Sequence, residues 1–221
     1  MRSTSRTTSL ELANGNLNRL RRKELTSIMK TVCVFCGSSS GKNPSYTAAA
    51  KHLGKLLAER ELTLVYGGGN VGLMGEIANS ALAHGGKAIG VIPQFLVEKE
   101  LAHEKLSEVR IVESMHERKA IMAELADGFI ALPGGFGTLE ETIEVLTWAQ
   151  LGLHGKPIGL LNIDRYFNSL YEFFKHMVDQ EFLHPEYKDM ILIKDDAAEI
   201  LDSLASFQLP YNAKWGDLKN A

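Results

Sequence analysis

The sequence predicts an α/β protein with a single doubly wound, Rossmann-like domain and a mostly parallel sheet. Short apolar segments alternate with segments of helical period from residue 31 to residue 205. The apolar segments are almost continuous in apolar residues, which is typical of parallel strands buried on both faces. Two glycine-rich turns, at 67–75 and 134–138, each follow an apolar segment and precede a helical one. This arrangement favours βαβ units over an all-helical or all-strand fold.

Seven strands are expected, each from an apolar run that ends at glycine, proline or polar residues: 31–36, 62–66, 87–92, 109–112, 128–132, 157–162 and 191–193. Six helices are expected from apolar residues at helical spacing: 45–60, from the first glycine run to 84, 114–126, from the second glycine turn to 150, 166–180 and 196–205. Ser114 and Glu117 form the capping-box pattern at the start of the third helix.

The chain divides into three parts by composition. Residues 1–30 hold seven Lys and Arg against two Glu, are rich in Ser and Thr, and have no apolar period, so a disordered basic extension is expected there. Residues 31–205 form the domain, and 206–221 form a C-terminal tail. The extension lacks the apolar region of a secretory signal, although its composition resembles a weak organelle transit peptide. A dispensable extension on a cytoplasmic protein is the preferred interpretation.

Composition excludes several classes of protein. No run approaches about 18 apolar residues, so no membrane-spanning helix is expected. Two cysteines are too few for a disulfide scaffold or a multi-cysteine zinc site. The seven histidines form no H-x-x-x-H pair, and no metal site is predicted. A net charge of −3 argues against a general nucleic-acid-binding protein.

The first glycine turn, YGGGNVGLMG, formally contains the dinucleotide fingerprint G-x-G-x-x-G. The next expected strand ends in GVIPQ, without the acidic residue that would hold a ribose, so NAD is not predicted. Free backbone N–H groups at a helix start suit an anion. Phosphate binding is therefore predicted for Gly67, Gly68, Gly69 and Gly72, and for Gly134 in the second turn; the alternative is that these glycines only permit tight helix–strand packing.

The second glycine turn, PGGFGTLEE, has the same form of strand, glycines and helix start. Thr138 is expected to cap the helix, with Glu141 three residues later, and a plain capping box is one interpretation of this pair. The glycines at 134, 135 and 137 favour the other, a ligand beside a carboxylate. Ligands of doubly wound folds bind at the carboxyl ends of strands. The site is therefore expected between the two glycine turns.

The second turn matches the signature PGG-x-GT-x-x-E of the Lonely Guy (LOG) family. Further segments resemble that family in the same order: CVFCGSS at 33–39, the first glycine turn, GVIP at 90–93, the stretch around Glu100, SMHERK at 114–119 and LTWAQLG at 146–152. The resemblance covers residues 31 to about 205, and no motif position departs from the pattern.

The resemblance implies a phosphoribohydrolase that releases free cytokinin bases from cytokinin riboside 5′-monophosphates. It implies Arg118 and Glu141 as the catalytic pair. It implies nucleotide contacts from Arg118 and Glu141 themselves and from Glu100, Lys119, Gly135, Phe136, Gly137, Thr138, Leu139, Glu140 and Thr147. It further implies a homodimer. The helix through Thr147 is the expected interface, because its apolar residues spread around much of its circumference. Hydrolysis needs no electron sink or redox group, so no organic cofactor is predicted.

Other interpretations remain beside this one. The substrate is alternatively any purine nucleoside 5′-monophosphate such as AMP, or the chain is a nucleotide-binding module without turnover. No lysine stands in a pattern that marks a pyridoxal-phosphate enzyme, so a lysine decarboxylase is not predicted. Arg118 and Lys119 by themselves are typical of a solvated helix face. Because neighbouring helical residues point about 100° apart, we expect one of the two to bind and the other to support.

Overall fold

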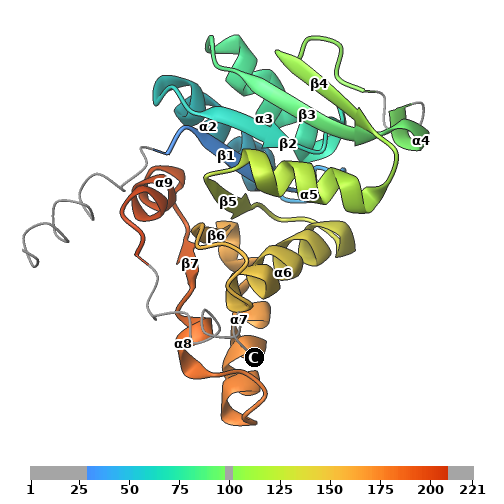
Figure 1. The fold of residues 1–221 in the computed structure, drawn as a ribbon. Coiled ribbons are helices and arrows are strands. Elements are labelled where there is room, and N and C mark those ends of the chain that lie inside the picture. Colours follow the sequence, from blue (N-terminus) through green and yellow to red (C-terminus); the bar gives the residue numbers. More distant parts are fainter. Residues whose placement is uncertain (1–28, 98–101, 209–221) are drawn as a thin grey trace, which may run out of the picture.

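The computed structural model describes residues 29–97 and 102–208 (Figure 1). Their strands form one sheet in the order β4-β3-β2-β1-β5-β6-β7, and every neighbouring pair is parallel. The strands are β1 (Thr31–Phe35), β2 (Thr63–Tyr66), β3 (Ala88–Pro93), β4 (Glu108–Val112), β5 (Gly128–Ala131), β6 (Ile158–Leu161) and β7 (Ile191–Lys194). The predicted α/β class and all seven predicted strands are confirmed.

The six predicted helices are also present: α2 (Pro44–Glu59), α3 (Gly72–Ala83), α5 (Met115–Leu125), α6 (Phe136–Gln150), α7 (Asn168–Asp179) and α9 (Ala197–Ala205). Three short elements were not expected: α4 (Gln94–Val97), α8 (Pro185–Lys188) and the 3-10 turn η1 (Ile163–Arg165). Elements of one turn are too short to show a hydrophobic period, which is why the sequence does not reveal them. In the described part of the chain, no helix combines the length and apolarity that crossing a membrane requires.

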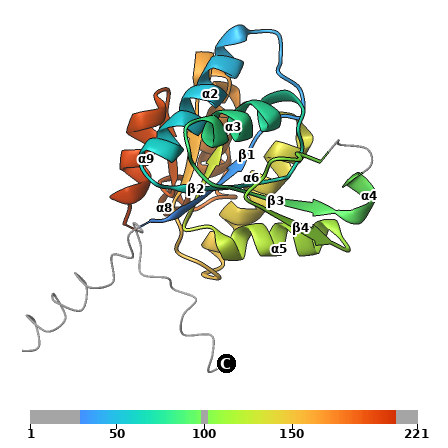
Figure 2. The ribbon, with the colours of Figure 1, turned by 90° about the horizontal axis from the view of Figure 1, so that it is seen from above.

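Helices cover both faces of the sheet (Figure 2). On one face α2, α3 and α9 pack against β1 and β2 through a core that includes Leu53, Leu57, Ile77 and Leu201. On the other face α5 and α6 pack against a second core, where the rings of Phe35 and Phe129 stack 5.9 Å apart. Each central strand therefore sends alternate side chains into two different cores, which accounts for its continuous apolar sequence.

The strand order reverses at β1. The chain runs from β1 outward through β2, β3 and β4, then returns to pair β5 with the other side of β1. The carboxyl ends of β1 and β5 are thus the topological switch point at which doubly wound folds bind ligands. The glycine turns after β2 and β5 lie on either side of the carboxyl end of β1, because β2 and β5 are the two neighbours of β1 in the sheet.

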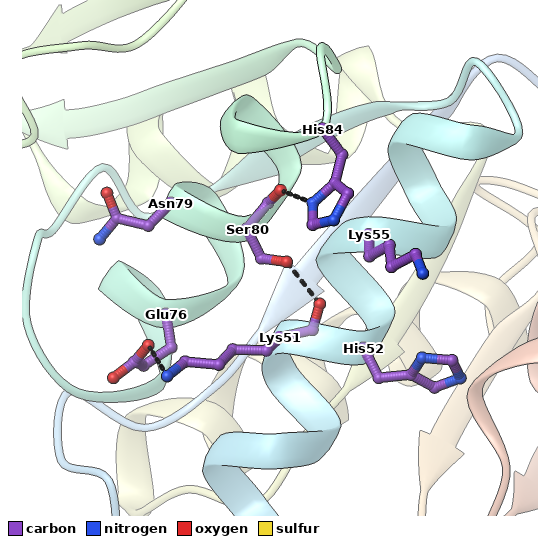
Figure 3. A pocket seen from close by; sticks show the side chains of 7 residues that line it. All are labelled: Lys51, His52, Lys55, Glu76, Asn79, Ser80 and His84. Atoms are coloured by element: carbon purple, nitrogen blue, oxygen red, sulfur yellow. Dashed lines mark hydrogen bonds and ion pairs between the residues drawn. The ribbon is translucent and has the colours of Figure 1, made fainter.

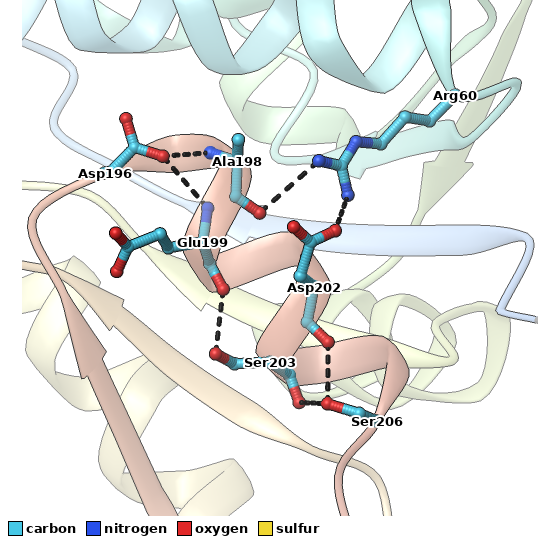
Figure 4. Close-up of polar contacts among 7 residues, drawn as sticks. All are labelled: Arg60, Asp196, Ala198, Glu199, Asp202, Ser203 and Ser206. Atoms are coloured by element: carbon cyan, nitrogen blue, oxygen red, sulfur yellow. Dashed lines mark hydrogen bonds and ion pairs between the residues drawn. The ribbon is translucent and has the colours of Figure 1, made fainter.

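Side-chain caps define several helix starts. Ser114 accepts a hydrogen bond from the Glu117 amide at 3.1 Å, and the Glu117 carboxylate accepts one from the Glu113 amide at 2.8 Å. This confirms the predicted capping box, with the carboxylate one residue further back than the standard pattern. Asp196 caps α9, and Arg60 donates to Asp202 at 2.5 Å, which ties the end of α2 to α9 (Figure 4).

The predicted cap of α6 is wrong. The helix begins at Phe136 with Gly135 as its N-cap, so Thr138 lies inside the first turn and no side chain caps the helix. Gly134 makes this arrangement sterically feasible, because a Cβ there would overlap Oγ1 of Thr138 and stand 2.9 Å from the amide nitrogen of Gly37. Thr138 is consequently buried against the glycine turn instead of capping it.

Candidate active site

A pocket of about 350 Å³ opens at the switch point of the sheet, within the size range of small-molecule sites. Elements far apart in the sequence contribute to it: the end of β1, the turn after β2, α5 and the start of α6. Its lining residues are Val34, Phe35, Cys36, Gly37, Ser38, Gly67, Met74, Leu96, Met115, Arg118, Met122, Gly135, Phe136, Gly137, Thr138, Glu140 and Glu141. Its surface is polar and apolar in similar measure, and Arg118, Glu140 and Glu141 are its charged residues.

The two predicted catalytic residues face each other in this pocket. Nη2 of Arg118 on α5 lies 3.8 Å from Oε1 of Glu141 on α6, and both side chains are almost entirely buried. Nη1 of Arg118 points at the sulfur of Met115 at 3.7 Å, and its Nε is buried without a hydrogen-bond partner. A buried guanidinium with unused donors beside a pocket is suited to binding an anionic or electron-rich group.

Gly67 provides the space in which the guanidinium lies. A Cβ at residue 67 would overlap Nη2 of Arg118 and stand 3.1 Å from its Cζ and 3.3 Å from the sulfur of Met74. The absence of a side chain here therefore admits Arg118 to the pocket. This is a packing role, and the predicted contact of Gly67 with phosphate stays a prediction.

The start of α6 turns backbone donors toward the pocket. The first hydrogen bond of the helix runs from the Leu139 amide to the Gly135 carbonyl at 3.1 Å. The amides of residues 136–138 come before this bond and therefore have no carbonyl partner within the helix. Gly135 and Gly137 line the pocket, and a Cβ on either would meet nothing within 4 Å. An uncapped helix start beside an open cavity combines free N–H groups with the positive end of the helix dipole, which is the usual arrangement of an anion site.

Lys119, next to Arg118, does not line the pocket. Its amino group donates to Glu140 and, at 3.1 Å, to Glu144, both on α6. Burial lowers the pKa of Lys119, but its hydrogen bonds to Glu140 and Glu144 outweigh that effect and the net pKa is raised. Of the two basic residues, Arg118 lines the pocket and Lys119 does not, and the expectation that one binds and the other supports stays a prediction. The solvated-face interpretation is wrong for both, because both are buried.

The remaining predicted phosphate-binding glycines are not in the pocket wall, although Gly134 lines a neighbouring cavity. Gly72 has a φ of +55°, and a Cβ there would overlap the backbone of Ser38 and Ser39. Gly69 forms an isolated bridge with Ala102, and the Gly68 carbonyl accepts from the His103 amide at 3.1 Å. Gly68 also has a positive φ of +78°, so backbone conformation accounts for the glycines at 68 and 72, and the phosphate contact of Gly68, Gly69 and Gly72 stays a prediction.

Two other predicted contact residues, Leu139 and Thr147, do not line the pocket. Leu139 packs on the sheet beside Ala131 and Leu160. Thr147 lies exposed further along α6, with its hydroxyl donating to the Ile143 carbonyl at 2.7 Å. Glu100 lies outside the described residues. The pocket thus contains part of the predicted set of nucleotide-contacting residues, and the contacts of Leu139, Thr147 and Glu100 with a nucleotide stay predictions.

The sequence-based prediction missed the loop after β1. Gly37 and Ser38 line the pocket and also a second cavity of about 360 Å³ next to it. That cavity is walled by Tyr46 and Tyr166, whose rings meet edge to face 5.7 Å apart, and the Tyr166 hydroxyl donates to the Gly134 carbonyl at 2.5 Å. The available signal was the run GSSSG directly after the central strand, which resembles a P-loop only partly.

Both cysteines are unsuited to nucleophilic chemistry. Cys33 and Cys36 are free thiols whose side chains enter cores on opposite faces of the sheet. Burial, followed by the charge of Glu141, raises the pKa of each thiol well above its ordinary value. A thiol held in its neutral form is a poor nucleophile even though Cys36 borders the pocket.

A larger and more open groove lies away from this site, between α2 and α3 (Figure 3). Its charges are largely paired on the surface, for example Lys51 with Glu76 at 3.2 Å and Lys55 with Glu59 at 3.5 Å. It lies on the sides of two helices and away from the carboxyl ends of the strands. Among residues 29–97 and 102–208, no group of three His, Cys, Asp or Glu side chains is placed to hold a metal ion.

Comparison with solved structures agrees with the fold. The molybdenum cofactor binding protein of Rippkaea orientalis superposes with a TM-score of 0.60 over 80% of this chain and 96% of that one, at 23% identity. At this identity the likeness concerns the fold alone.

Sequence comparisons identify the family. Residues 74–204, more than half of the chain, match the family model described as "Possible lysine decarboxylase". The chain is 52% identical over 187 residues to the cytokinin riboside 5′-monophosphate phosphoribohydrolase LOG7 of Arabidopsis thaliana, covering 84% of this chain and 86% of that protein. It is 49% identical over 178 residues to LOG3 of the same plant, covering 80% and 83%. Identity of about 50% over four fifths or more of the chain places the chain in the LOG family.

Proposed function

We propose that this protein hydrolyses the N-glycosidic bond of cytokinin riboside 5′-monophosphates and releases the free base and ribose 5-phosphate. The observation that carries the proposal is the buried opposition of Arg118 and Glu141, 3.8 Å apart, beside the uncapped start of α6. The names of the relatives at about 50% identity support the same reaction.

Glu141 stabilises the reacting sugar. Cleavage of the bond between ribose C1′ and the purine leaves positive charge on the ribose, and a carboxylate beside C1′ stabilises that charge. The oxygen of a water molecule then bonds to C1′, and one of its protons passes to a base within reach of that water. Of the two carboxylates that line the pocket, Glu141 is buried and Glu140 is exposed, and we assign both tasks to Glu141.

Arg118 stabilises the leaving group. The bond electrons go to the departing purine, which becomes electron-rich until it is protonated. The guanidinium remains charged at any working pH and has a buried Nε–H without a partner to offer. Donors aimed at developing charge in a buried site contribute more than they would in water.

The start of α6 suits the 5′-phosphate. A monophosphate carries close to two negative charges and three acceptor oxygens. The amides of residues 136–138 and the dipole of a helix that runs from Phe136 to Gln150 offer matching donors and charge. Free space at Gly135 and Gly137 allows the phosphate to approach this backbone.

A lysine decarboxylase, the activity in the family model's description, has less support. Pyridoxal-phosphate enzymes attach the cofactor to a lysine. No lysine lines the pocket among the described residues, and Lys119 next to it is bonded to Glu140 and Glu144. A nucleotide-binding module without turnover would not need the buried pairing of Arg118 with Glu141.

The test compares substrates under identical conditions. Isopentenyladenosine monophosphate, AMP and isopentenyladenosine are incubated with the protein, and base and ribose 5-phosphate are quantified. We expect release of base from the prenylated monophosphate. Losing two charge-assisted hydrogen bonds costs about 3–6 kcal/mol, so kcat/KM for the riboside should be lower by about two to four orders of magnitude.

Values of kcat/KM for monophosphate and riboside within about tenfold of each other would remove the phosphate site from the proposal. Faster hydrolysis of AMP than of the prenylated nucleotide would favour the broader purine nucleoside monophosphate nucleosidase. No base release from any of the three would favour the binding module.

A homodimer is also proposed, from the surface of α6. Phe136 is 93% exposed, and Ile143 and Leu151 are exposed on the same side of the helix, with Thr147 between them. An apolar stripe along one helix side suits the self-complementary interface of a two-fold dimer. Light scattering should give twice the chain mass of 24.4 kDa, and the single-chain mass would contradict the dimer.

A further inference from the structure

A second contact between α5 and α6 stands directly beside the Arg118–Glu141 pair. Lys119 follows Arg118, Glu140 precedes Glu141, and the Lys119 amino group donates to Glu140 and, at 3.1 Å, to Glu144. The side chain of Lys119 is 8% exposed, whereas Glu140 is 54% exposed and Glu144 24%, so the lysine is buried and its contact with Glu144 is the better shielded of the two. The two helices are thus joined by two contacts: Arg118 with Glu141 in the pocket, and Lys119 with Glu140 and Glu144 beside it, where Glu140 borders the pocket and Lys119 does not.

We infer that Lys119 is a positioning residue, which holds the first turns of α6 against α5 so that Glu141 stays opposed to Arg118. The inference rests on the proposed function. Two observations support it: Lys119 does not line the pocket, and its amino group forms ion pairs with two carboxylates of α6. A distance of 3.8 Å between Arg118 and Glu141 is not a tight ion pair, so their own contact holds the helices weakly.

Charge explains why α6 needs this lysine. Glu140 and Glu144 are four residues apart and lie on one side of the helix, and like charges at this spacing repel. Glu141 follows Glu140 in the sequence and adds a third negative charge to the same turns. Lys119 neutralises part of this charge and bridges both carboxylates. Without it, the two glutamates would separate toward solvent and take the first turns of α6 with them. Small displacements of catalytic groups cost large factors in rate, as much as about 100-fold for 1 Å.

Two roles for Lys119 predict different kinetics. If Lys119 contacts the nucleotide, as the LOG resemblance implies, its loss raises KM, and removing the charge of Glu144 leaves that loss unchanged. If Lys119 acts through α6, its loss lowers kcat with little change in KM. Removing Glu144 then reproduces part of the loss, and the two losses do not add.

The experiment is a double-mutant cycle on the full chain with a cytokinin riboside monophosphate. It uses Lys119→Met, Glu144→Gln and the double variant, with Lys119→Arg as the charge-preserving substitution. Lys175→Met is the matched control, because Lys175 pairs with Glu172 on the exposed side of α7. We expect Lys119→Met to lower kcat by about 10- to 100-fold with KM within about threefold. We expect Lys119→Arg to restore most of kcat, and Lys175→Met to match the unmodified protein.

The pH profile supplies a readout that a purely structural role would not move. The charged or titratable groups around Glu141 include Arg118 on α5, Cys33 on β1, Cys36 directly after β1, and Glu140 and Glu144 on its own helix. Loss of the Lys119 charge leaves the α6 carboxylates less compensated, which disfavours their ionised forms. The acidic limb of kcat/KM should move to higher pH in Lys119→Met and stay in place in Lys119→Arg.

The outcomes separate this inference from the proposed function. An unmodified protein that hydrolyses none of the nucleotides contradicts the function. Coupling between Lys119 and Glu144 in thermal unfolding then still tests the cross-helix contact, and additive losses of stability would overturn it. An active protein in which Lys119→Met raises KM at constant kcat, or in which the kinetic losses add, overturns the positioning role.

Discussion

The guanidinium of Arg118 fills the volume that a side chain at Gly67 would occupy. A side chain at position 67, at the end of β2, would overlap Nη2 of Arg118, which comes from α5. No positive φ is required at Gly67, so its constraint is space and not backbone conformation. The glycine turn thus serves the pocket by making room for the arginine.

Gly67→Ala should therefore abolish most activity without unfolding the protein. The overlapping atom is the far end of a flexible side chain, so Arg118 can swing aside at small cost in stability. Displacing a group aimed at transition-state charge costs about two orders of magnitude or more in kcat. Turnover assays beside thermal unfolding check this, and near-normal kcat would show that Arg118 tolerates the methyl group in place.

Gly72→Ala is the matching control and should behave in the opposite way. At Gly72 the overlap is with the backbone of Ser38 and Ser39, and φ is +55°, where side chains are strained. Neither the loop nor the helix start can yield easily. We expect a loss of stability of at least about 1 kcal/mol, measured by denaturant unfolding, and a Tm equal to that of Gly67→Ala would contradict this contrast.

Arg118→Ala and Glu141→Gln should each lower turnover by at least about 100-fold, as removal of one electrostatic stabiliser typically does. Glu141→Gln keeps the volume and replaces a buried charge with a neutral amide, so its fold should survive. Arg118→Ala leaves the buried Glu141 without this cation, so its unfolding free energy must be measured alongside kcat. Near-normal turnover in either folded variant would remove that residue from the mechanism.

Asp196 should stabilise the protein in a pH-dependent way. Its carboxylate accepts from the amides of Glu199 at 2.9 Å and Ala198 at 2.8 Å, and these hydrogen bonds lower the pKa of Asp196 from its ordinary value of 3.8. Because the folded-state pKa is lowered, the contribution is complete at neutral pH and is lost as pH falls through that lowered pKa.

Asp196→Ala should cost about 1 kcal/mol at neutral pH, typical of a lost N-cap, and the difference should shrink in acid below the ordinary pKa. Asp196→Asn is the control, since Asn caps as well as Asp but does not titrate in this range. Denaturant unfolding at several pH values checks both. A difference that does not change with pH would show that α9 does not depend on the ionised cap.

Removal of residues 1–28 should leave Tm and activity unchanged. Their sequence has no apolar period with which to dock on a domain. The described body begins at Met29, which packs against the core of α2 and α3, and the amides of Lys30 and Thr31 donate to Asp127 at 2.8 and 3.0 Å. A chain that starts at Met29 keeps these contacts. A large loss of Tm or activity would show that the extension contributes to the folded protein.

The sequence by itself determined the strands, the main helices and the members of the candidate catalytic pair. Strands such as β5 and helices such as α2 depend on local apolar spacing, which is visible in single segments. Arg118 and Glu141 were predictable because two separate motifs carry them in an order that resembles one family. Helix ends were predictable where a side chain caps them, as Ser114 does for α5.

Only the tertiary structure decided how these parts work together. It placed Arg118 in the pocket and Lys119 against Glu140 and Glu144, a choice set by the rotation of α5 about its own axis as it packs on the sheet. It moved the start of α6 to Phe136 because Gly134 leaves room for Thr138. It also gave Gly67 its role as the space for a guanidinium. Each of these depends on contacts between segments far apart in the chain, whose free energy is not encoded in the propensity or period of either segment alone.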